Sequence, residues 1–332
     1  MKAITLNSNY SSKLLLTDVL ERALEPGEAK VAIQAAALNH RDEWCRKGLY
    51  PNLKDGVVLG SDGSGIVEEV GDGVDLNWVG KEVIINPAIN WGEDQKAQGK
   101  KFEILGMPRN GTLSEKVIVP ADRLKIKPEH LSFEEAAALP LAGLTAFRAL
   151  FYQGQVKPED KVLITGFGGG VAQFAFQFAL KAGAEVYASS SKTEKLKKAT
   201  ELGAKAVFNY TEEDWTEKAI QKSNGFDLVI DSAVGNTLNN LIDVVKPGGK
   251  IVFYGATRGN PTDLTARKVF WNQLKIMGTT MGSDQDFEHM IQFVQENKIS
   301  PIIDQVFTFD EAEIAFDRMK EGKQLGKIIL KL

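Results

Sequence analysis

The chain has 332 residues, of which 43% are hydrophobic and 25% charged, and its formal net charge is -4 at pH 7. This length allows two domains with full hydrophobic cores. The low net charge and the scattered basic residues argue against nucleic acid as a partner. No apolar stretch is long enough to span a membrane. The start of the chain has no signal-peptide pattern, which favours the cytoplasm. The single cysteine, Cys45, excludes an intrachain disulfide and is expected to be a small buried side chain.

The first part of the chain is predicted to be a β-rich domain. Short segments with alternating or β-branched residues are bounded by glycine and proline at Ala29–Ala36, Gly65–Val70, Glu82–Asn86 and Leu113–Val119. A polar stretch with three glycines and a proline covers Asn90–Asn110. It is expected to be a surface loop, with a substrate lid as the alternative.

A glycine-rich turn in the middle of the chain indicates a dinucleotide site. Val162–Thr165 has the length and β-branched content of a buried parallel strand, and an amphipathic helix begins after it. Glycines between them allow a tight turn and a close approach to phosphate oxygens, while the helix supplies free N–H groups. The alternative is a glycine loop that only turns the chain. The glycines are Gly166, Gly168, Gly169 and Gly170.

The segments after this turn predict a doubly wound parallel sheet. Four further strands are separated by helical or turn-rich stretches, which is typical of right-handed crossover connections. They are expected at Glu185–Ala188, Val207–Tyr210, Asp227–Asp231 and Lys250–Gly255, the last preceded by a turn at Lys246–Gly249. Helices near Asp286–Glu296 and Asp310–Lys320 follow, and a closing strand, Lys327–Leu330, is expected to return to the first domain.

The end of the second predicted strand favours NADPH over NADH. An NAD site carries an acidic residue there, about 20 residues past the glycine turn, to bind the ribose 2'-hydroxyl. This chain has Ser190, Ser191 and Lys192 instead, and hydroxyl groups with a cation suit a 2'-phosphate. The same residues also fit a cap of the next helix, and both roles are compatible.

Several motifs in order resemble the medium-chain dehydrogenase/reductase superfamily over nearly the whole chain. They are Ala37–Asp42, Arg46–Pro51, Gly60–Gly65, Leu139–Ala146 and the glycine turn. The resemblance implies an α/β protein with a GroES-like β-barrel catalytic domain, 1–125 and 282–332, and a Rossmann NADPH-binding domain, 126–281. It also implies a dimer or a tetramer, of which a homodimer is expected.

The resemblance also bears on zinc. In zinc alcohol dehydrogenases of this superfamily two cysteines and a histidine hold the catalytic metal. The matching places here are Asn39, Ser61 and, less securely, Leu141. None of them offers a thiolate or an imidazole, so no metal is expected.

Asn39 and Asp42 instead fit the Asn-x-x-Asp pattern of quinone oxidoreductase-like members, although Trp44 stands where many of these carry tyrosine. By resemblance Asn39 donates a hydrogen bond to the substrate carbonyl, while the alternative is an asparagine that only caps a turn. His40 and Tyr50 are candidate proton donors, with packing roles as the alternatives. The expected cofactor contacts are the four glycines, Thr145, Val171, Ser190, Ser191, Lys192, Lys195, Tyr210 and Gly255.

The sequence thus predicts an NADPH-dependent, zinc-independent oxidoreductase that delivers hydride to a quinone or an α,β-unsaturated carbonyl such as an enone or enal. The alternatives are an oxidoreductase acting on alcohols or saturated carbonyls and a non-catalytic NADPH-binding sensor.

Overall fold

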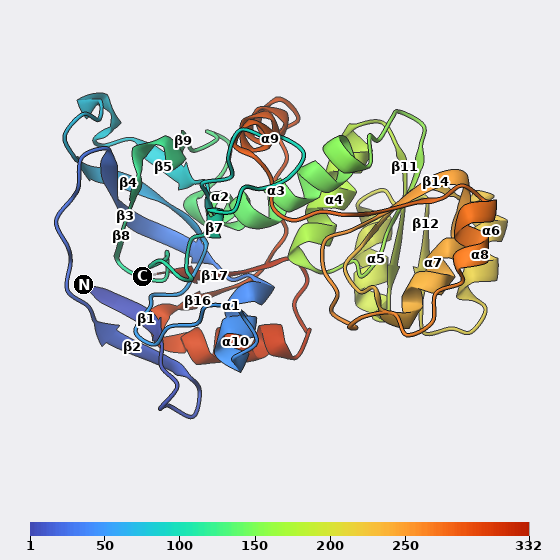
Figure 1. The fold of residues 1–332 in the computed structure, drawn as a ribbon, viewed down its shortest axis with the longest axis horizontal. Coiled ribbons are helices and arrows are strands. Elements are labelled where there is room, and N and C mark those ends of the chain that lie inside the picture. Colours follow the sequence, from blue (N-terminus) through green and yellow to red (C-terminus); the bar gives the residue numbers. More distant parts are fainter. Residues whose placement is uncertain (332) are drawn as a thin grey trace. The chain divides into compact units, whose positions relative to one another are not determined.

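The computed structural model describes residues 1–331, which divide into two compact units (Figure 1). Unit 1 comprises Met1–Ala142 and the segment from Gly282 onward, and unit 2 comprises Gly143–Met281. The first boundary lies later than the expected one at residue 125. The reason is packing: the helix over Phe133–Ala138, α2, lies against the sheet of unit 1, and Ser64 Oγ donates a 2.6 Å hydrogen bond to the Phe133 carbonyl.

Unit 1 is built around a seven-stranded sheet in which strands from both ends of the chain are neighbours. The order is β16-β17-β3-β4-β5-β9, and β8 also pairs with β3. Along β3, Ala29, Val31 and Ile33 are buried and alternate with half-buried residues, the period of a strand with one face in the core. The bounds are β3 (Glu28–Ala37), β4 (Asp62–Val70), β5 (Glu82–Ile85), β8 (Lys116–Pro120), β9 (Leu124–Ile126), β16 (Ile303–Thr308) and β17 (Lys327–Lys331).

Two small antiparallel strand pairs and several helices complete unit 1. The closing strand β17 pairs with β3, so the end of the chain returns to the first unit. The remaining elements are β1 (Lys2–Leu6), β2 (Leu14–Asp18), β6 (Ala88–Ile89), β7 (Glu103–Ile104), α1 (His40–Lys47), α9 (Asp284–Glu296), α10 (Ala312–Lys320) and the 3-10 turns η1 (Leu76–Trp78), η2 (Ala121–Arg123) and η5 (Phe309–Glu311).

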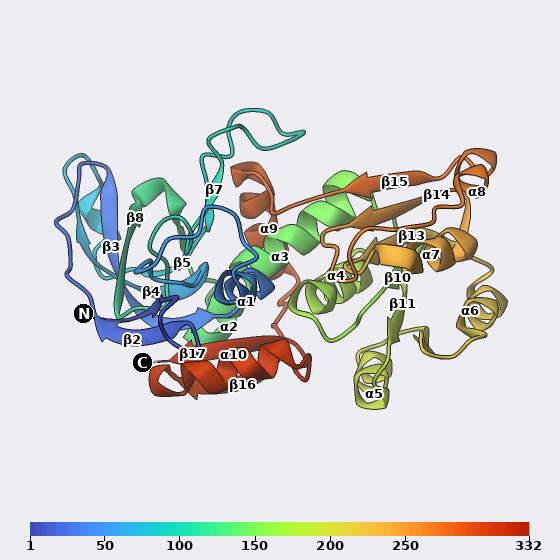
Figure 2. The same ribbon diagram turned by 60° about the horizontal axis from the view of Figure 1, so that its bottom comes forward.

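Unit 2 is a six-stranded parallel sheet whose strands alternate with helices, which confirms the predicted doubly wound fold (Figure 2). The order is β12-β11-β10-β13-β14-β15. The first strand of this unit, β10, lies in the middle of the sheet. The next two strands, β11 and β12, add on one side of it, and the chain then crosses to β13 on the other side, so the strand order reverses between β10 and β13. Ligands of such sheets bind at the carboxyl ends of the strands beside this reversal.

The bounds in unit 2 follow the predicted alternation. The strands are β10 (Lys161–Ile164), β11 (Glu185–Ser190), β12 (Ala206–Asn209), β13 (Phe226–Asp231), β14 (Val245–Phe253) and β15 (Lys275–Gly278). The helices are α4 (Gly170–Lys181), α5 (Thr193–Glu201), α6 (Trp215–Ser223), α7 (Leu238–Val244), α8 (Ala266–Trp271), the π-helix η3 (Arg148–Gln153) and the 3-10 turn η4 (Gly235–Thr237), while α3 (Pro140–Phe147) leads into the unit.

The fifth strand of the parallel sheet differs from its predicted form. Val245 already pairs with Phe226, residues 246–249 loop out, and Lys250 resumes the pairing opposite Leu228. Gly248 has a φ of 76°, which glycine adopts without strain. The predicted turn therefore lies inside the strand rather than before it.

Among residues 1–331, no helix combines the length and the apolar character needed to cross a bilayer.

Candidate active site

In unit 1, strand register brings three polar side chains from distant segments together. β17 runs antiparallel to β3 with Ile329 opposite Ala37, and the Leu38 amide donates to the Ile328 carbonyl at 3.0 Å. Continuing this register by two residues places Lys327 opposite Asn39. On the other side of β3, Ala37 pairs with Asp62, the first residue of β4. Asn39, Asp62 and Lys327 therefore meet at one end of the sheet.

These three side chains form a closed set of hydrogen bonds. Lys327 Nζ lies 2.7 Å from Asn39 Oδ1 and 3.0 Å from Asp62 Oδ2, and Asn39 Nδ2 lies 2.9 Å from the same Asp62 oxygen. The backbone N–H of Leu141 donates to the other Asp62 oxygen at 2.8 Å. Asp62 is 0%, Lys327 2% and Asn39 7% exposed. Asn39 is the N-cap residue of α1 and forms a capping box with Asp42, and its amide group also bonds to Asp62 of β4 and Lys327 of β17.

A second buried cation lies beside this set. The Arg41 guanidinium donates to Ser61 Oγ at 2.5 Å and to the carbonyl oxygens of Leu105 and Met107. Its Nε–H also donates to Tyr50 Oη at 3.3 Å, and the guanidinium lies 4.7 Å from the centre of the Tyr50 ring. Arg41 thereby holds Tyr50, and because the Tyr50 oxygen accepts this bond, its own proton is left to donate elsewhere.

Helix α1 places two further ionisable groups inside unit 1. Asp42 is fully buried and accepts a hydrogen bond from the Asn39 backbone N–H at 2.8 Å, and burial raises the pKa of its carboxyl group. Cys45 is buried, as expected, and burial together with the charge of Asp42 raises its pKa to about 12. The Cys45 thiol therefore stays protonated near neutral pH and is a packing group. His40 begins the same helix and is exposed.

In unit 2 the glycine turn has the backbone geometry that glycine alone tolerates well. Gly166 and Gly168 have φ values of 60° and 121°. A Cβ on Gly168 would lie 2.4 Å from Lys195 Cδ and 3.0 Å from Lys195 Nζ, so the lysine side chain lies directly against the turn. Gly169 is the N-cap residue of α4, which begins at Gly170 and leaves its first N–H groups without helical acceptors. This turn fits a pyrophosphate group.

The carboxyl end of β11 carries the predicted serines and lysine. Ser190 is buried, and Lys192 is the exposed N-cap residue of α5 with no side-chain cap hydrogen bond. Ser190 pairs with Asn209, which places the following residue, Tyr210, at the same edge of the sheet. Lys195, one turn into α5, is only 9% exposed.

Arg258 is a further residue at this edge, and sequence reasoning missed it. Its guanidinium lies 5.6 Å from the centre of the Tyr210 ring, and its backbone N–H donates to the Ala233 carbonyl at 3.0 Å. Gly255 also lies at this edge, two residues past the end of β14. Of the other predicted contacts, Val171 is in the first turn of α4 and Thr145 is buried in α3.

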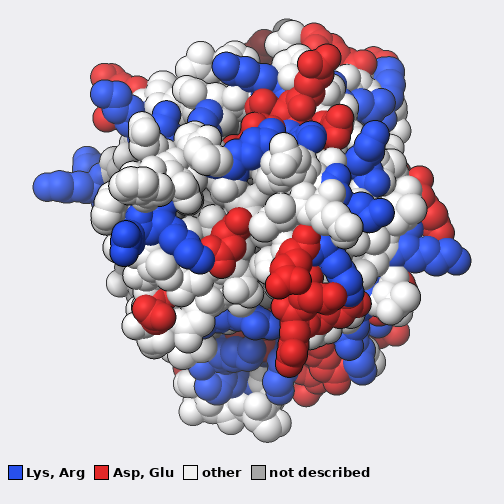
Figure 3. Space-filling view, turned by 90° about the vertical axis from the view of Figure 1, so that its right-hand side faces the viewer, with Lys and Arg blue, Asp and Glu red and all other residues white. Residues whose placement is uncertain are grey.

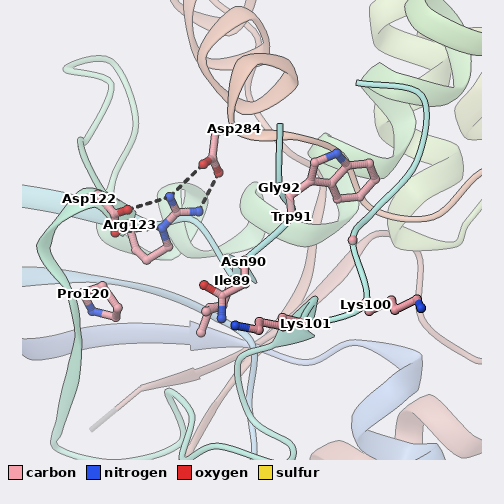
Figure 4. A pocket seen from close by; sticks show the side chains of 11 residues that line it. Ile89, Asn90, Trp91, Gly92, Lys100, Lys101, Pro120, Asp122, Arg123 and Asp284 are labelled. Atoms are coloured by element: carbon pink, nitrogen blue, oxygen red, sulfur yellow. Dashed lines mark hydrogen bonds and ion pairs between the residues drawn. The ribbon is translucent and has the colours of Figure 1, made fainter. Parts of the chain in front are cut away.

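A separate cavity of about 540 Å³ opens in unit 1 beside the stretch predicted as a surface loop or lid (Figure 4). Arg123 crosses one side of it and is bound to Asp122 and Asp284, as the dashed lines in Figure 4 show. Trp91 is buried and packs edge-on against Phe102, with ring centres 5.3 Å apart. The cavity lining includes none of the predicted site residues.

Comparisons with known proteins identify the family of this chain. The model of the alcohol dehydrogenase GroES-like domain matches residues 25–129, and that of the zinc-binding dehydrogenase domain matches residues 170–296. The zinc-type alcohol dehydrogenase-like protein YogA of Leptosphaeria maculans is 36% identical, over 96% of this chain and 94% of its own. The chain belongs to the medium-chain dehydrogenase/reductase superfamily.

Two solved structures extend the comparison within this superfamily. One, described as an NAD-dependent alcohol dehydrogenase, has a TM-score of 0.95 and 36% identity, with 100% of both chains covered. Another is the 2-octenoyl-CoA carboxylase reductase CinF in complex with NADP and 2-octenoyl-CoA, with a TM-score of 0.86 and 26% identity over 99% of this chain and 87% of that chain. The present chain is a nicotinamide-dependent oxidoreductase of the superfamily.

The names of the matching family and relative raise the question of zinc, and the residues of this chain do not fit one. At the expected ligand positions, the Asn39 oxygen accepts from Lys327 and the Ser61 oxygen accepts from Arg41. Leu141 donates its backbone N–H to Asp62, and its aliphatic side chain has no atom that can ligate a metal. Within residues 1–331 no group of three or more His, Cys, Asp or Glu side chains is placed to hold a metal ion.

Proposed function

We propose that this protein is an NADPH-dependent, zinc-independent reductase of quinones or α,β-unsaturated carbonyl compounds. The observation that carries the proposal is the amide of Asn39, which buried charged groups hold at a position where zinc members have a metal ligand. When bound, the nicotinamide supplies the hydride. The chain itself must bind the cofactor and stabilise the negative charge that develops on the acceptor oxygen.

Asn39 is suited to that second task. Its amide nitrogen carries two hydrogens, and Asp62 accepts one of them. The other is left for a carbonyl oxygen, so Asn39 serves as an oxyanion donor. A conjugated acceptor takes hydride without a metal. An alcohol must lose its hydroxyl proton as hydride leaves, and zinc normally makes that loss accessible.

Protonation of the reduced acceptor has three sources. Tyr50 has its hydroxyl proton available because Arg41 donates to its oxygen. His40 is exposed and follows Asn39 directly in the chain, and an imidazole can act as a general acid. Solvent is the third source.

The choice of NADPH follows from the edge of the parallel sheet in unit 2. No acidic residue ends β11, whereas Ser190 and Ser191 offer hydroxyl groups and Lys192 a cation. The structure adds Lys195, which lies against the glycine turn, and Arg258, which lies over Tyr210. The CinF complex, with NADP and a conjugated thioester, supports both halves of the proposal.

The names of YogA and of the NAD-dependent alcohol dehydrogenase favour a second candidate, an oxidoreductase acting on alcohols or saturated carbonyls. One experiment separates the two, and a non-catalytic sensor as well. NADPH oxidation is measured with a panel of quinones, enals and enones, and NAD and NADP reduction is measured with simple alcohols. The reductase predicts turnover in the first series alone, the second candidate predicts turnover in the second, and a sensor binds NADPH but turns over nothing.

We also propose that the protein forms a homodimer through the open edge of the parallel sheet. Strand β15 ends the sheet on that side. Just before it, Phe270 and Trp271 are 68% and 76% exposed, which is unusual for large aromatic side chains outside an interface.

On the face in Figure 3, basic and acidic side chains are interspersed, which gives no continuous basic surface there for nucleic acid.

A further inference from the structure

Lys327 is a buried lysine to which the sequence assigned no role. It begins β17, is 2% exposed, and points its ammonium group at Asn39 Oδ1 and Asp62 Oδ2, 2.7 and 3.0 Å away. The strands fix this placement, because the register of β17 on β3 sets Lys327 opposite Asn39. Three apolar, buried residues follow it in the strand, so Lys327 is a buried charged residue next to a hydrophobic core segment.

We propose that Lys327 is a positioning residue that orients and polarises the Asn39 amide as an oxyanion donor. The inference rests on the proposed function, because it assigns to Lys327 a task in that same reaction. In this role Lys327 acts on the substrate only through its hydrogen bond to Asn39.

The orientation follows from which groups donate and which accept. A lysine ammonium only donates hydrogen bonds and an ionised carboxylate only accepts them. The amide oxygen of Asn39 must therefore face Lys327, and its nitrogen must face Asp62 at 2.9 Å. A rotation of the amide by 180° would set nitrogen against ammonium and oxygen against carboxylate. The pair thus fixes the direction of the remaining N–H.

The polarisation follows from charge and burial. A hydrogen bond from a cation draws electron density toward the amide oxygen and makes the N–H hydrogens more positive. Because Lys327 and Asp62 are almost wholly buried, solvent screens this effect only weakly. Asp62 uses one N–H and anchors the group, so the second N–H is the donor that Lys327 strengthens.

A double-mutant cycle with Asn39→Ala and Lys327→Met tests the proposal. Lys327→Met is expected to lower kcat about tenfold with a conjugated acceptor and to leave NADPH affinity unchanged. In the Asn39→Ala background the same change is expected to cost less than about twofold, because the group on which Lys327 acts is gone. Lys331→Met is the matched control, since Lys331 lies in the same strand but is exposed and pairs with Glu134 at 2.6 Å.

A second variant covers the case in which Lys327→Met does not fold, since it leaves Asp62 buried without its counter-charge. The double change Asp62→Asn with Lys327→Gln keeps amide groups in both places and removes both charges. We expect it to fold and to show a stronger dependence of kcat on the electron-withdrawing power of substituents on the acceptor than the unmutated protein. A purely structural lysine would leave that dependence unchanged.

The outcomes separate this inference from the proposed function. Absence of turnover with every quinone, enal and enone by the unmutated protein would overturn the proposed function itself. Full activity of Asn39→Ala with a conjugated acceptor would leave that function standing and would overturn the oxyanion role of Asn39 and, with it, the role of Lys327. Loss of activity in Asn39→Ala, together with an equal effect of Lys327→Met in both backgrounds or none in either, would overturn only the role of Lys327. An unchanged substituent dependence in the neutral pair would do the same.

Discussion

Replacing Lys195 should weaken NADPH binding selectively, and the structure gives the size of the effect. Lys195 is 9% exposed and lies in the first turn of α5, just past the end of β11 where the 2'-phosphate is expected, so its contact with that phosphate would be poorly screened by solvent. Hydrogen bonds to charged groups in such settings contribute about 1.5–3 kcal/mol. Lys195→Met is therefore expected to raise the Kd for NADPH by about 10- to 150-fold. Lys192 is exposed, and Lys192→Met should raise it only about 2- to 5-fold.

The charge-reversed variant Lys192→Glu should discriminate further, because a carboxylate repels the 2'-phosphate and leaves NADH, which lacks it, largely unaffected. Lys197→Met is the matched control, since Lys197 lies in the same helix with its side chain 79% exposed. Calorimetric titration of each variant with NADPH and with NADH measures the effects. Equal losses for both cofactors, or equal affinity of the unmutated protein for both, would refute the assignment.

Three further predictions concern the site, the metal and the assembly. Asn39→Ala should lower kcat by roughly 100-fold in steady-state reduction of an enone, with NADPH affinity largely kept, because the oxyanion donor is lost; a fully active variant would contradict this role. Elemental analysis of the purified protein should find no stoichiometric zinc, because Asn39, Ser61 and Leu141 offer neither a thiolate nor an imidazole, whereas one zinc per chain would show the reasoning to be wrong. Phe270→Ser with Trp271→Ser should convert a dimer to a monomer in analytical ultracentrifugation, while an unchanged mass would place the interface elsewhere.

The parallel sheet of unit 2 was predictable because its signals are local. The apolar run before Gly166, the glycines and the amphipathic helix after them are adjacent in the chain, and the strands that follow repeat the pattern. The boundary between the units was expected at residue 125, but it lies after Ala142. The position of α2 depends on its packing against β3 and β4, and the sequence around α2 does not indicate this long-range packing.

The candidate active site was predictable only in part. Asn39 and Tyr50 were found through their motifs, but the partners that hold them depend on long-range register. Lys327 is 288 residues from Asn39 and meets it only because β17 pairs with β3. A charged residue at the start of an apolar strand was the one available signal. Arg258 reaches Tyr210 from the loop after β14, and nothing in its local sequence indicates this contact.

The most direct test of the central claim is the activity of chelator-treated, metal-free protein with NADPH and an enone, measured beside NADP with a simple alcohol. We predict undiminished enone reduction after metal removal and no appreciable alcohol oxidation, because the Asn39 amide held by Lys327 and Asp62 stabilises the developing oxyanion. Loss of enone reduction on chelation that added zinc restores, or alcohol turnover exceeding enone turnover, would contradict it.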